Sequence, residues 1–318
     1  MIPRRNLFRA FKKSIAQPRY AYQALWQRGK SLFTYHFEDG HSSYPETISC
    51  LLTYRCNLRC KMCGQWGENG SSKHFTPDML KQELSLGAIK SIVDDVKEFK
   101  PNITLFGGEP LLHKDCLEIV SYVKQSGMRC NVITNGTVLQ KYAEKLVDIG
   151  LDEIIFSLDG PRKIHDETRN AQGTFEKAYA GLMCVAEAKN KKGKEFPHVN
   201  ISSTLFETNY RFLDDTVEVA EQVKAKSITF HHLIFLNRET YDKQNRIFER
   251  YFNTTCHDWG GFVRDKLPEI DVKYLLKKIE GLKTRDSKVD ISFYPNFTND
   301  EIFHYYTDFN FVPSSYKK

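Results

Sequence analysis

The segment "NITLFGGEPLLHKDCLEIVSYVKQSGMRCNVITNG", residues 102–136, contains two short apolar runs separated by one amphipathic run. The apolar runs, 102–106 and 129–134, have the length of buried strands, and residues 114–127 predict a helix that ends at a glycine. A strand, a helix and a strand in this order normally form a parallel pair joined by a right-handed crossover. The segment therefore predicts a parallel α/β sheet.

The same alternation extends along the chain in both directions. Six runs predict strands, at residues 47–53, 102–106, 129–134, 151–157, 198–205 and 227–235. Five runs between them predict helices, at residues 76–99, 114–127, 138–150, 174–193 and 209–225. Thr76 is the expected N-cap of the first helix, with Pro77 in its first position. The strands are apolar throughout, which is typical of a sheet covered on both faces. This pattern fits both an open doubly wound sheet and a barrel.

Residues after 236 lose the alternation, although 241–252 and 272–282 are helical in character and 257–262 has the composition of a loop. We therefore expect three parts: a basic N-terminal arm over residues 1–40, an α/β core over residues 41–236, and an irregular C-terminal extension over residues 237–318.

The composition is that of a globular protein. Hydrophobic residues make up 41% of the 318 residues and charged residues 27%. No apolar run approaches the ~20 residues that cross a bilayer, and the N-terminus lacks the pattern of a secretory signal, so we expect a cytoplasmic protein. The eight cysteines are too sparse for a disulfide scaffold. Four scattered ones are expected to be small buried hydrophobes: Cys50, Cys116, Cys130 and Cys184.

The N-terminal arm is strongly basic. Residues 1–30 contain no acidic residue and eight basic ones: Arg4, Arg5, Arg9, Lys12, Lys13, Arg19, Arg28 and Lys30. Leu7, Phe8, Phe11 and Ile15 recur at roughly helical spacing. Such a segment can lie on an anionic membrane, a nucleic acid or an acidic partner. The interpretation we favour is a solvated arm that packs a few aromatic side chains on the main body.

Three cysteines follow the first predicted strand, as Cys56-x3-Cys60-x2-Cys63. One interpretation is a thioredoxin-like redox pair formed by Cys60 and Cys63, which leaves Cys56 without a role. A second is a structural zinc site of the Cys3His type that includes His74. A third is an iron–sulfur cluster, in which three thiolates would leave one iron of a four-iron cluster open for chemistry.

Further distinctive residues stand at or near the carboxyl ends of the later strands. They are Gly107, Gly108, Glu109 and Pro110, then Thr134, Asn135 and Gly136, then Ser157, Asp159 and Gly160, and finally His231 and His232. In parallel α/β sheets and barrels this edge is where ligands bind. Each motif taken singly also fits a turn. His231 and His232 point to opposite faces of one strand, so at most one faces a site, and a structural role is expected for either.

Together, the cysteine triad and the "GGEP" motif resemble the radical S-adenosylmethionine (radical SAM) superfamily. The later "TNG", "SLDG" and "IHDETRN…GTF" stretches are similar to the SPASM-type subfamily, which includes peptide-modifying enzymes and sulfatase maturases. The resemblance covers about residues 46–235. It implies a partial (β/α)6 barrel similar to a TIM barrel. It also implies a [4Fe–4S] cluster held by Cys56, Cys60 and Cys63, with S-adenosylmethionine on the fourth iron.

The resemblance also assigns the cofactor pocket. Gly107, Gly108 and Glu109, in the motif that Pro110 completes, would meet the methionyl amino group. Ser157 would contact the ribose or the carboxylate. Two further residues belong to the same pocket in this assignment: Arg169, whose guanidinium suits the carboxylate, and Asn135.

Two features depart from the family pattern. The residue before the third cysteine is often aromatic and packs near the adenine, whereas here it is Met62, with Trp66 close by. Relatives also commonly carry a cysteine-rich C-terminal domain with extra clusters. Only Cys256 follows Cys184 here, so either the enzyme works without such a cluster or the chain ends before such a domain, and the second interpretation is the one we favour.

The implied activity is reductive cleavage of S-adenosylmethionine to a 5′-deoxyadenosyl radical that abstracts hydrogen from a substrate. The expected substrate is a peptide or small natural product, and an anionic metabolite or lipid head group is the second candidate. The expected electron donor is a flavodoxin or ferredoxin. An alternative of another class is a zinc-stabilised protein that binds nucleic acid or membrane through its basic arm.

Overall fold

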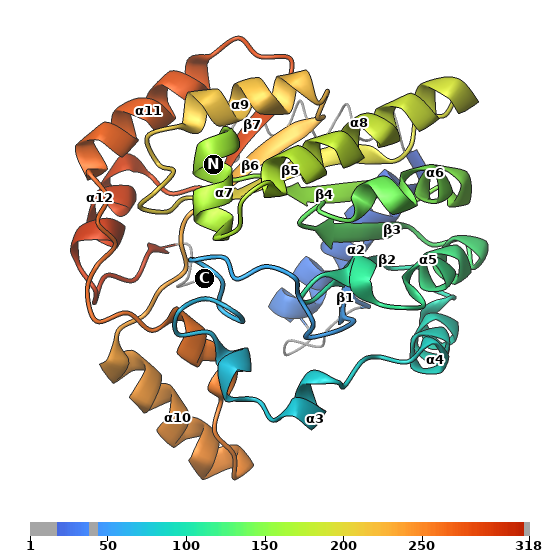
Figure 1. Ribbon diagram of the computed structural model, residues 1–318. Coiled ribbons are helices and arrows are strands. Elements are labelled where there is room, and N and C mark those ends of the chain that lie inside the picture. The colour runs from blue at the N-terminus through green and yellow to red at the C-terminus, as the bar shows by residue number, and fades with distance from the viewer. Residues whose placement is uncertain (1–17, 38–43, 315–318) are drawn as a thin grey trace.

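The computed structural model describes residues 18–37 and 44–314, and the predictions for the rest of the arm lie outside these ranges. A seven-stranded sheet is the centre of the fold, and its neighbouring strands all pair in parallel. The strands follow chain order: β1 Thr47–Leu51, β2 Asn102–Phe106, β3 Cys130–Thr134, β4 Glu153–Ser157, β5 His198–Thr204, β6 Ser227–His231 and β7 Asp290–Tyr294. Figure 1 shows them as an arc with most helices on its outer side, which confirms the predicted α/β partial barrel.

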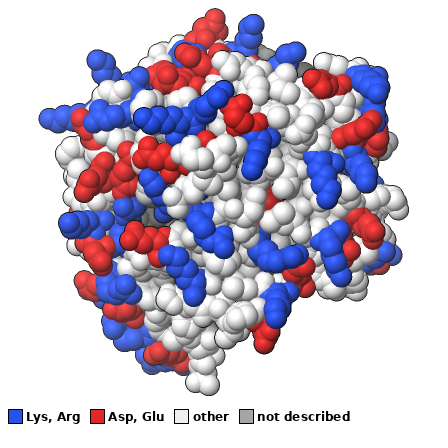
Figure 2. All heavy atoms as spheres, in the orientation of Figure 1, with Lys and Arg blue, Asp and Glu red and all other residues white. Residues whose placement is uncertain are grey.

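The helices that connect and flank the strands are α2 Pro18–Phe37, α3 Pro77–Leu80, α4 Leu86–Val96, α5 Cys116–Gln125, α6 Leu139–Ile149, α7 Arg162–Arg169, α8 Thr174–Lys192, α9 Leu213–Gln222, α10 Arg238–Phe252, α11 Val272–Thr284 and α12 Asn299–Thr307. Short 3-10 helices are η1 Ser71–His74, η2 Pro110–Leu112 and η3 His257–Phe262. A search of the described part of the chain finds no helix with the length and apolar character needed to cross a membrane. Figure 2 shows basic and acidic side chains interspersed over one face.

The core lies between the outer face of the sheet and the surrounding helices. It contains strand side chains such as Ile103, Leu105, Val132, Ile154 and Phe230, each no more than 1% exposed. The inner face is different, because burial alternates along β4, β5 and β6. The prediction of strands covered on both faces is therefore right for β2 and β3 and wrong for these three and for β1, where only Cys50 is buried.

Polar side chains occupy part of this inner face. The Ser227 hydroxyl donates to Asn200 Oδ1 at 2.8 Å, and the hydroxyls of Thr229 and Ser292 lie 2.9 Å apart. Hydroxyl and amide groups can bind polar ligands, whereas the packed outer face cannot. The inner face is therefore the side of the sheet that can bind a polar ligand.

Three of the four scattered cysteines are buried as predicted: Cys50, Cys116 and Cys130. Cys184 is only partly buried. The aromatic side chains of α2 that the structure describes are exposed, so the expected packing of the arm on the main body is not found there.

The predicted helix over 76–99 is wrong as a single element. Thr76 caps α3 by accepting from the Met79 N–H, as predicted, but α3 ends at Leu80 and α4 begins after Ser85. The intervening residues pair with the chain after β1, where the Leu84 N–H donates to Leu52 O at 3.0 Å. This tertiary pairing outweighs the local helical preference.

The predicted six strands are joined by a seventh, β7, from the region expected to be irregular. It pairs with β6, with Ile228 opposite Ile291 and Phe230 opposite Phe293. Its sequence, DISFY, mixes polar and apolar residues, which hid it among the surrounding aromatic residues. Helix α7, which follows β4, and helix α12 were also not predicted.

The two adjacent histidines at the end of β6, His231 in the strand and His232 directly after it, do point to opposite sides. His232 is 2% exposed, its Nδ1 lies 3.0 Å from the Tyr306 hydroxyl, and its ring stacks on Phe297. Burial lowers the pKa of His232 to about 3. His231 is half-buried, and its ring meets that of Tyr294 edge-on.

His232 should make stability depend on pH. Folded His232 stays neutral down to a pKa of about 3, whereas the unfolded side chain takes up a proton below about 6.5. The unfolding free energy should therefore fall as pH drops below 6.5, with a His232 share on the order of 2 kcal/mol by pH 5. Denaturant titrations at several pH values should show a shallower fall for His232→Phe. His304→Gln, at an exposed position, should keep the wild-type slope.

Candidate active site

The segment that carries the three cysteines, residues 52–75 (the cysteine loop), lies on the inner side of the sheet (Figure 1). Its first part continues the pairing of β1 with β2. The Gly108 N–H donates to Thr53 O at 2.7 Å, and the Glu109 N–H donates to Arg55 O at 2.8 Å. Farther on, the Lys61 N–H donates to Thr168 O of α7 at 3.0 Å. The loop is therefore fixed to the sheet on one side and to α7 on the other.

The two glycines of the "GGEP" motif make this attachment possible. Gly107 has a φ of +141°, and a Cβ placed on it would lie 2.5 Å from Thr53 O. A Cβ on Gly108 would lie 2.1 Å from Arg55 O. At both positions, the absence of a side chain lets the backbone of the cysteine loop lie close to the backbone of the motif. Pro110, the last residue of the motif, is buried and begins η2.

Each of the three cysteine sulfurs accepts at least one N–H donor. Cys56 Sγ receives the Leu58 N–H at 3.4 Å and Asn135 Nδ2 at 4.0 Å. Cys60 Sγ receives Arg169 Nη1 at 3.6 Å, and Cys63 Sγ receives the Trp66 N–H at 3.3 Å. Donors aimed at sulfur stabilise a thiolate, and such bonds tune iron–sulfur clusters. The donor set therefore fits three thiolate ligands of a [4Fe–4S] cluster.

Two of the three thiols, those of Cys56 and Cys60, would hold their protons without metal. Burial raises the pKa of Cys56 to about 11, and the charges of Cys60, Glu109 and Cys63 add to the shift, while the Leu58 N–H works against it. Burial also raises the pKa of Cys60, although Arg169 opposes this. Binding of a metal centre would have to displace these protons.

The zinc interpretation does not fit the geometry. Within residues 18–37 and 44–314, no three His, Cys, Asp or Glu side chains converge closely enough to hold one metal ion. A Cys3His zinc site needs four ligands at one centre. In a cuboidal cluster, in contrast, each thiolate binds a different iron, so the sulfurs lie farther apart.

Glu109 lies beneath the loop and is completely buried. Its Oε1 accepts the Thr134 hydroxyl at 2.7 Å and the Leu111 N–H at 3.1 Å, and its Oε2 accepts the Asn135 N–H at 2.8 Å. Burial raises the pKa of Glu109 above its ordinary value, although these hydrogen bonds oppose the shift. The carboxylate thus joins the ends of β2 and β3. Oε2 accepts one bond from the described residues and retains a lone pair for another donor.

Asn135 connects this carboxylate to the cysteine loop. Its Nδ2 donates to Asn57 Oδ1 at 3.0 Å, and its Oδ1 accepts the Thr137 N–H at 2.9 Å. The structure therefore brings Cys56, Glu109 and Asn135 together.

Arg169 stands beside Cys60 from the end of α7. Its Nη2 lies 2.5 Å from Asp159 Oδ2, in a buried ion pair, and Asp159 Oδ1 accepts the Thr204 N–H. Burial alone would lower the pKa of Arg169, but the Asp159 carboxylate and the Cys60 sulfur outweigh it and raise the pKa. Asp159 was not among the predicted site residues, because the sequence Asp159-Gly160-Pro161 fits an ordinary turn.

The two remaining predicted residues, Ser157 and Met62, lie near the site without a side-chain hydrogen bond to the cysteines, Glu109 or Arg169 among the described residues. Ser157 ends β4 half-buried, on the same edge of the sheet as the other motifs. Met62 is half-buried within the cysteine loop and lines a cavity beside it.

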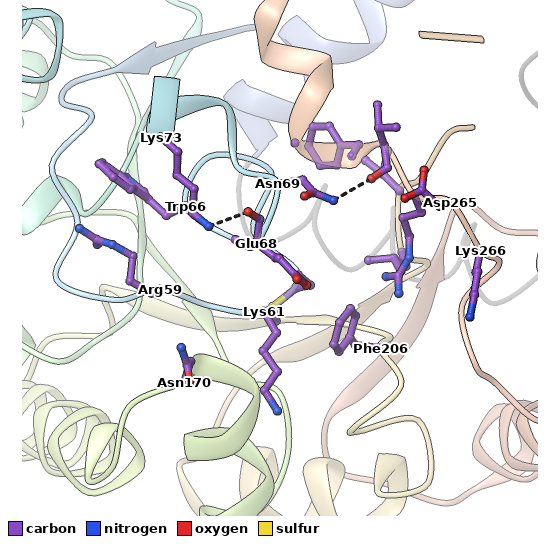
Figure 3. Close-up of a pocket in the computed structure, with 18 residues that line it drawn as sticks. Arg59, Lys61, Trp66, Glu68, Asn69, Lys73, Asn170, Phe206, Asp265 and Lys266 are labelled. Atoms are coloured by element: carbon purple, nitrogen blue, oxygen red, sulfur yellow. Dashed lines mark hydrogen bonds between the residues drawn. The ribbon is translucent and has the colours of Figure 1, made fainter. Parts of the chain in front are cut away.

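This cavity, of about 720 Å³, is the loop cavity shown in Figure 3. Its walls come from the cysteine loop, the C-terminal end of α7, the segments after β5 and β6, and the segment that includes η3. They contain two acidic side chains, Glu68 and Asp265, and five basic ones: Arg59, Lys61, Lys73, Arg264 and Lys266. Of the residues predicted to bind cofactor, Met62 alone lines it. The loop cavity therefore adjoins the predicted cofactor pocket.

The C-terminal part of the chain closes on the cysteine loop. A Cβ on Gly261 would lie 1.7 Å from Gly64 O, and a Cβ on Gly64 would lie 2.3 Å from the Phe262 ring. Asn69 Nδ2 donates to Val263 O at 3.3 Å. Sequence reasoning treated residues 257–262 as a plain loop, and their glycine pair was the signal that it missed.

Comparison with known proteins identifies the family. Residues 50–249 match the model of the radical SAM superfamily, so the chain belongs to this superfamily and is an enzyme. The Fe-coproporphyrin III synthase of Methanosarcina barkeri is 33% identical over 189 residues, which are 59% of this chain and 44% of that protein. A probable GTP 3′,8-cyclase of Methanococcus maripaludis is 33% identical over 147 residues, 46% of this chain and 47% of the relative.

Solved structures share the fold. SuiB of Streptococcus suis, bound to its precursor peptide SuiA, matches with a TM-score of 0.58 and 14% identity over 89% of this chain and 60% of that one. SuiB bound to S-adenosylmethionine matches with a TM-score of 0.57 and 14% identity over 92% of this chain and 65% of that one. The chain spans about half the length of the two relatives named above, the Fe-coproporphyrin III synthase and the probable GTP 3′,8-cyclase. Enzymes of this family use a [4Fe–4S] cluster and S-adenosylmethionine, as predicted.

The contact between Gly261 and Gly64 should be needed for cluster assembly. Gly261→Ala would force the cysteine loop to move, so it should lower the iron bound per chain after anaerobic reconstitution. Gly281→Ala makes the same chemical change where a new methyl group meets open space, and it should bind wild-type amounts of iron. Equal iron and sulfide contents in the two variants would contradict this prediction.

Proposed function

We propose that this chain binds a [4Fe–4S] cluster through Cys56, Cys60 and Cys63 and uses S-adenosylmethionine to abstract hydrogen from an anionic substrate. The main support is the set of N–H donors aimed at all three sulfurs, in a chain that belongs to the radical SAM superfamily. When bound, the cluster and S-adenosylmethionine supply one-electron cleavage of the sulfonium and hence a 5′-deoxyadenosyl radical.

The chain's own residues hold and position the cofactors in this proposal. Glu109 offers its remaining lone pair to the methionyl ammonium, and Gly107, Gly108 and Pro110 fix the backbone that carries it. Asn135 orients Cys56. Two further residues complete the pocket: Ser157 toward the ribose or carboxylate, and Met62 toward the adenine.

Arg169 has a more specific assignment. It directs one nitrogen at Cys60 Sγ and another at Asp159, and its buried Nε has no hydrogen-bond partner among the described residues. An unpaired buried donor is costly, so this nitrogen suits the cofactor carboxylate.

Removal of one thiolate should abolish the reaction. Anaerobically reconstituted protein with dithionite should convert S-adenosylmethionine to 5′-deoxyadenosine, and Cys60→Ala should reduce this to the background without enzyme. Cys184→Ala, a half-buried cysteine of α8, should keep wild-type turnover. Chromatographic detection of 5′-deoxyadenosine measures both. Unchanged product formation by Cys60→Ala would refute the proposal.

The loop cavity supports an anionic substrate. Lys61 pairs with Glu167, and Arg264 pairs with Glu207. The other three basic side chains of its walls have no carboxylate within 4 Å in the described part of the chain: Arg59, Lys73 and Lys266. The cavity falls within the usual size of small-molecule sites.

Aromatic side chains add planar walls to this cavity. The Arg59 guanidinium lies 4.1 Å from the centre of the Trp66 ring, whose Nε1 donates to Tyr54 O. Phe206, which Figure 3 labels, and Phe262 line other parts of the cavity. The names of two relatives contain Fe-coproporphyrin III and GTP, and both molecules combine planar ring systems with carboxylates or phosphates. We therefore favour a planar anionic small molecule over a peptide.

The basic side chains of the cavity should determine affinity. With coproporphyrin III and GTP as separate probes, at least one should bind anaerobic wild-type protein, and Lys73→Gln/Lys266→Gln should bind it roughly a hundredfold more weakly. Lys177→Gln, on the outer helix α8, should leave the dissociation constant unchanged. Isothermal titration or fluorescence quenching gives these constants. Failure of both probes, or equal affinity in the double variant, would contradict the anionic substrate.

Three earlier expectations stay predictions: a peptide substrate, a flavodoxin or ferredoxin as electron donor, and a cytoplasmic location. SuiB, the neighbour whose complex contains a peptide, resembles this chain at 14% identity and therefore in fold alone.

A further inference from the structure

Helix α2 carries an exposed apolar stripe. The stripe consists of six large side chains that are each at least 53% exposed: Tyr22, Leu25, Trp26, Leu32, Phe33 and Phe37. At 3.6 residues per turn, they fall within about 140° of the helix circumference. A Cβ on Gly29, in the middle of this stripe, would meet nothing within 4 Å. The rings of Phe33 and Phe37 lie 5.1 Å apart, so the stripe is continuous at its end.

The stripe faces away from the body of the protein. Thr34, on the other side of the helix, is the one buried residue among the α2 side chains that the structure describes. Arg28 and Lys30 flank the stripe, and Arg28 Nε pairs with Glu46 at 3.0 Å. An amphipathic helix normally buries its apolar side in the core, whereas α2 presents it outward. Exposed apolar surface of this extent marks an interaction site.

The positive charge of the chain is concentrated in the part of the sequence that contains this stripe. Residues 1–37 contain eight of the 46 basic residues and none of the 40 acidic ones. The remaining residues contain 38 basic and 40 acidic side chains, so the arm accounts for the whole positive net charge. A surface that complements this segment must be anionic and must also accept aromatic and aliphatic side chains.

We propose that α2 lies in the surface of an anionic lipid membrane, with its apolar stripe in the lipid and its basic residues at the headgroups. Interfacial helices of this kind combine tryptophan, phenylalanine and leucine on one side with lysine and arginine beside them. Tryptophan and tyrosine are stable at the headgroup level. Nucleic acid would satisfy the charge but would leave the six-residue stripe in water. A second copy of the chain would bring a second set of eight basic residues against the first.

Vesicle binding by the full chain tests this inference independently of catalysis. Anaerobically purified protein is mixed with vesicles of phosphatidylcholine alone or of phosphatidylcholine with phosphatidylglycerol, and the bound fraction is measured by sedimentation. Wild type should bind the mixed vesicles, and added salt should weaken binding. Trp26→Ser/Phe33→Ser should bind at least roughly tenfold more weakly.

Tyr35→Ser is the matched control, because Tyr35 is 74% exposed but lies outside the stripe. It should bind vesicles as wild type does, and circular dichroism should show that all variants keep the fold. Absence of wild-type binding to mixed vesicles would overturn the proposal, as would equal binding by the double variant. Light scattering provides the remaining outcome: a wild-type dimer that the double variant dissociates, without vesicle binding, would assign the stripe to self-association.

Discussion

Two backbone hydrogen bonds, from the N–H groups of Gly108 and Glu109 to the carbonyls of Thr53 and Arg55, hold the cysteine loop against the sheet. They extend the β1–β2 pairing beyond the ends of both strands. Any side chain at Gly107 or Gly108 would occupy the space of the loop backbone. The position of the first cysteine, and through it the site, depends on this contact.

Buried charge then orders the rest of the site. Glu109 is held by Leu111, Thr134 and Asn135, and Asp159 is paired with Arg169. Both carboxylates are fully buried, so each needs its partners to offset the cost of leaving water. These groups join the ends of β2, β3 and β4 to the cysteine loop. The strand-end motifs therefore act as one connected network around the three sulfurs.

The sequence predicted the elements that strong local patterns specify. Apolar runs, terminal glycines and capping residues act locally. They predicted six of the seven strands, the helix ends at Gly127 and Gly150, and the Thr76 cap. The break between α3 and α4 was not, since it results from pairing with a segment that precedes it by about thirty residues. Strand β7 was not predicted because it has only five residues, and polar and apolar residues are mixed within it.

The candidate site was predicted to a similar extent. The cysteines, Glu109 and Asn135 were recognised from motifs, and the structure places them together. The pairing of Asp159 with Arg169 and the contact of Gly261 and Phe262 with Gly64 were not predicted, because the partners are far apart in the sequence. The apolar character of the predicted strands also indicated that both faces of β4, β5 and β6 are buried. In the structure every second residue of these strands is only half-buried, on the face of the sheet that carries the cysteine loop.

The close contact between Gly64 and Gly261 has a consequence for how the protein matures. During translation, Gly261 leaves the ribosome about two hundred residues after the cysteines, so nascent chains expose the loop before its cover exists. The cysteine loop can therefore reach the packing described above only after the residues through η3 have been synthesised.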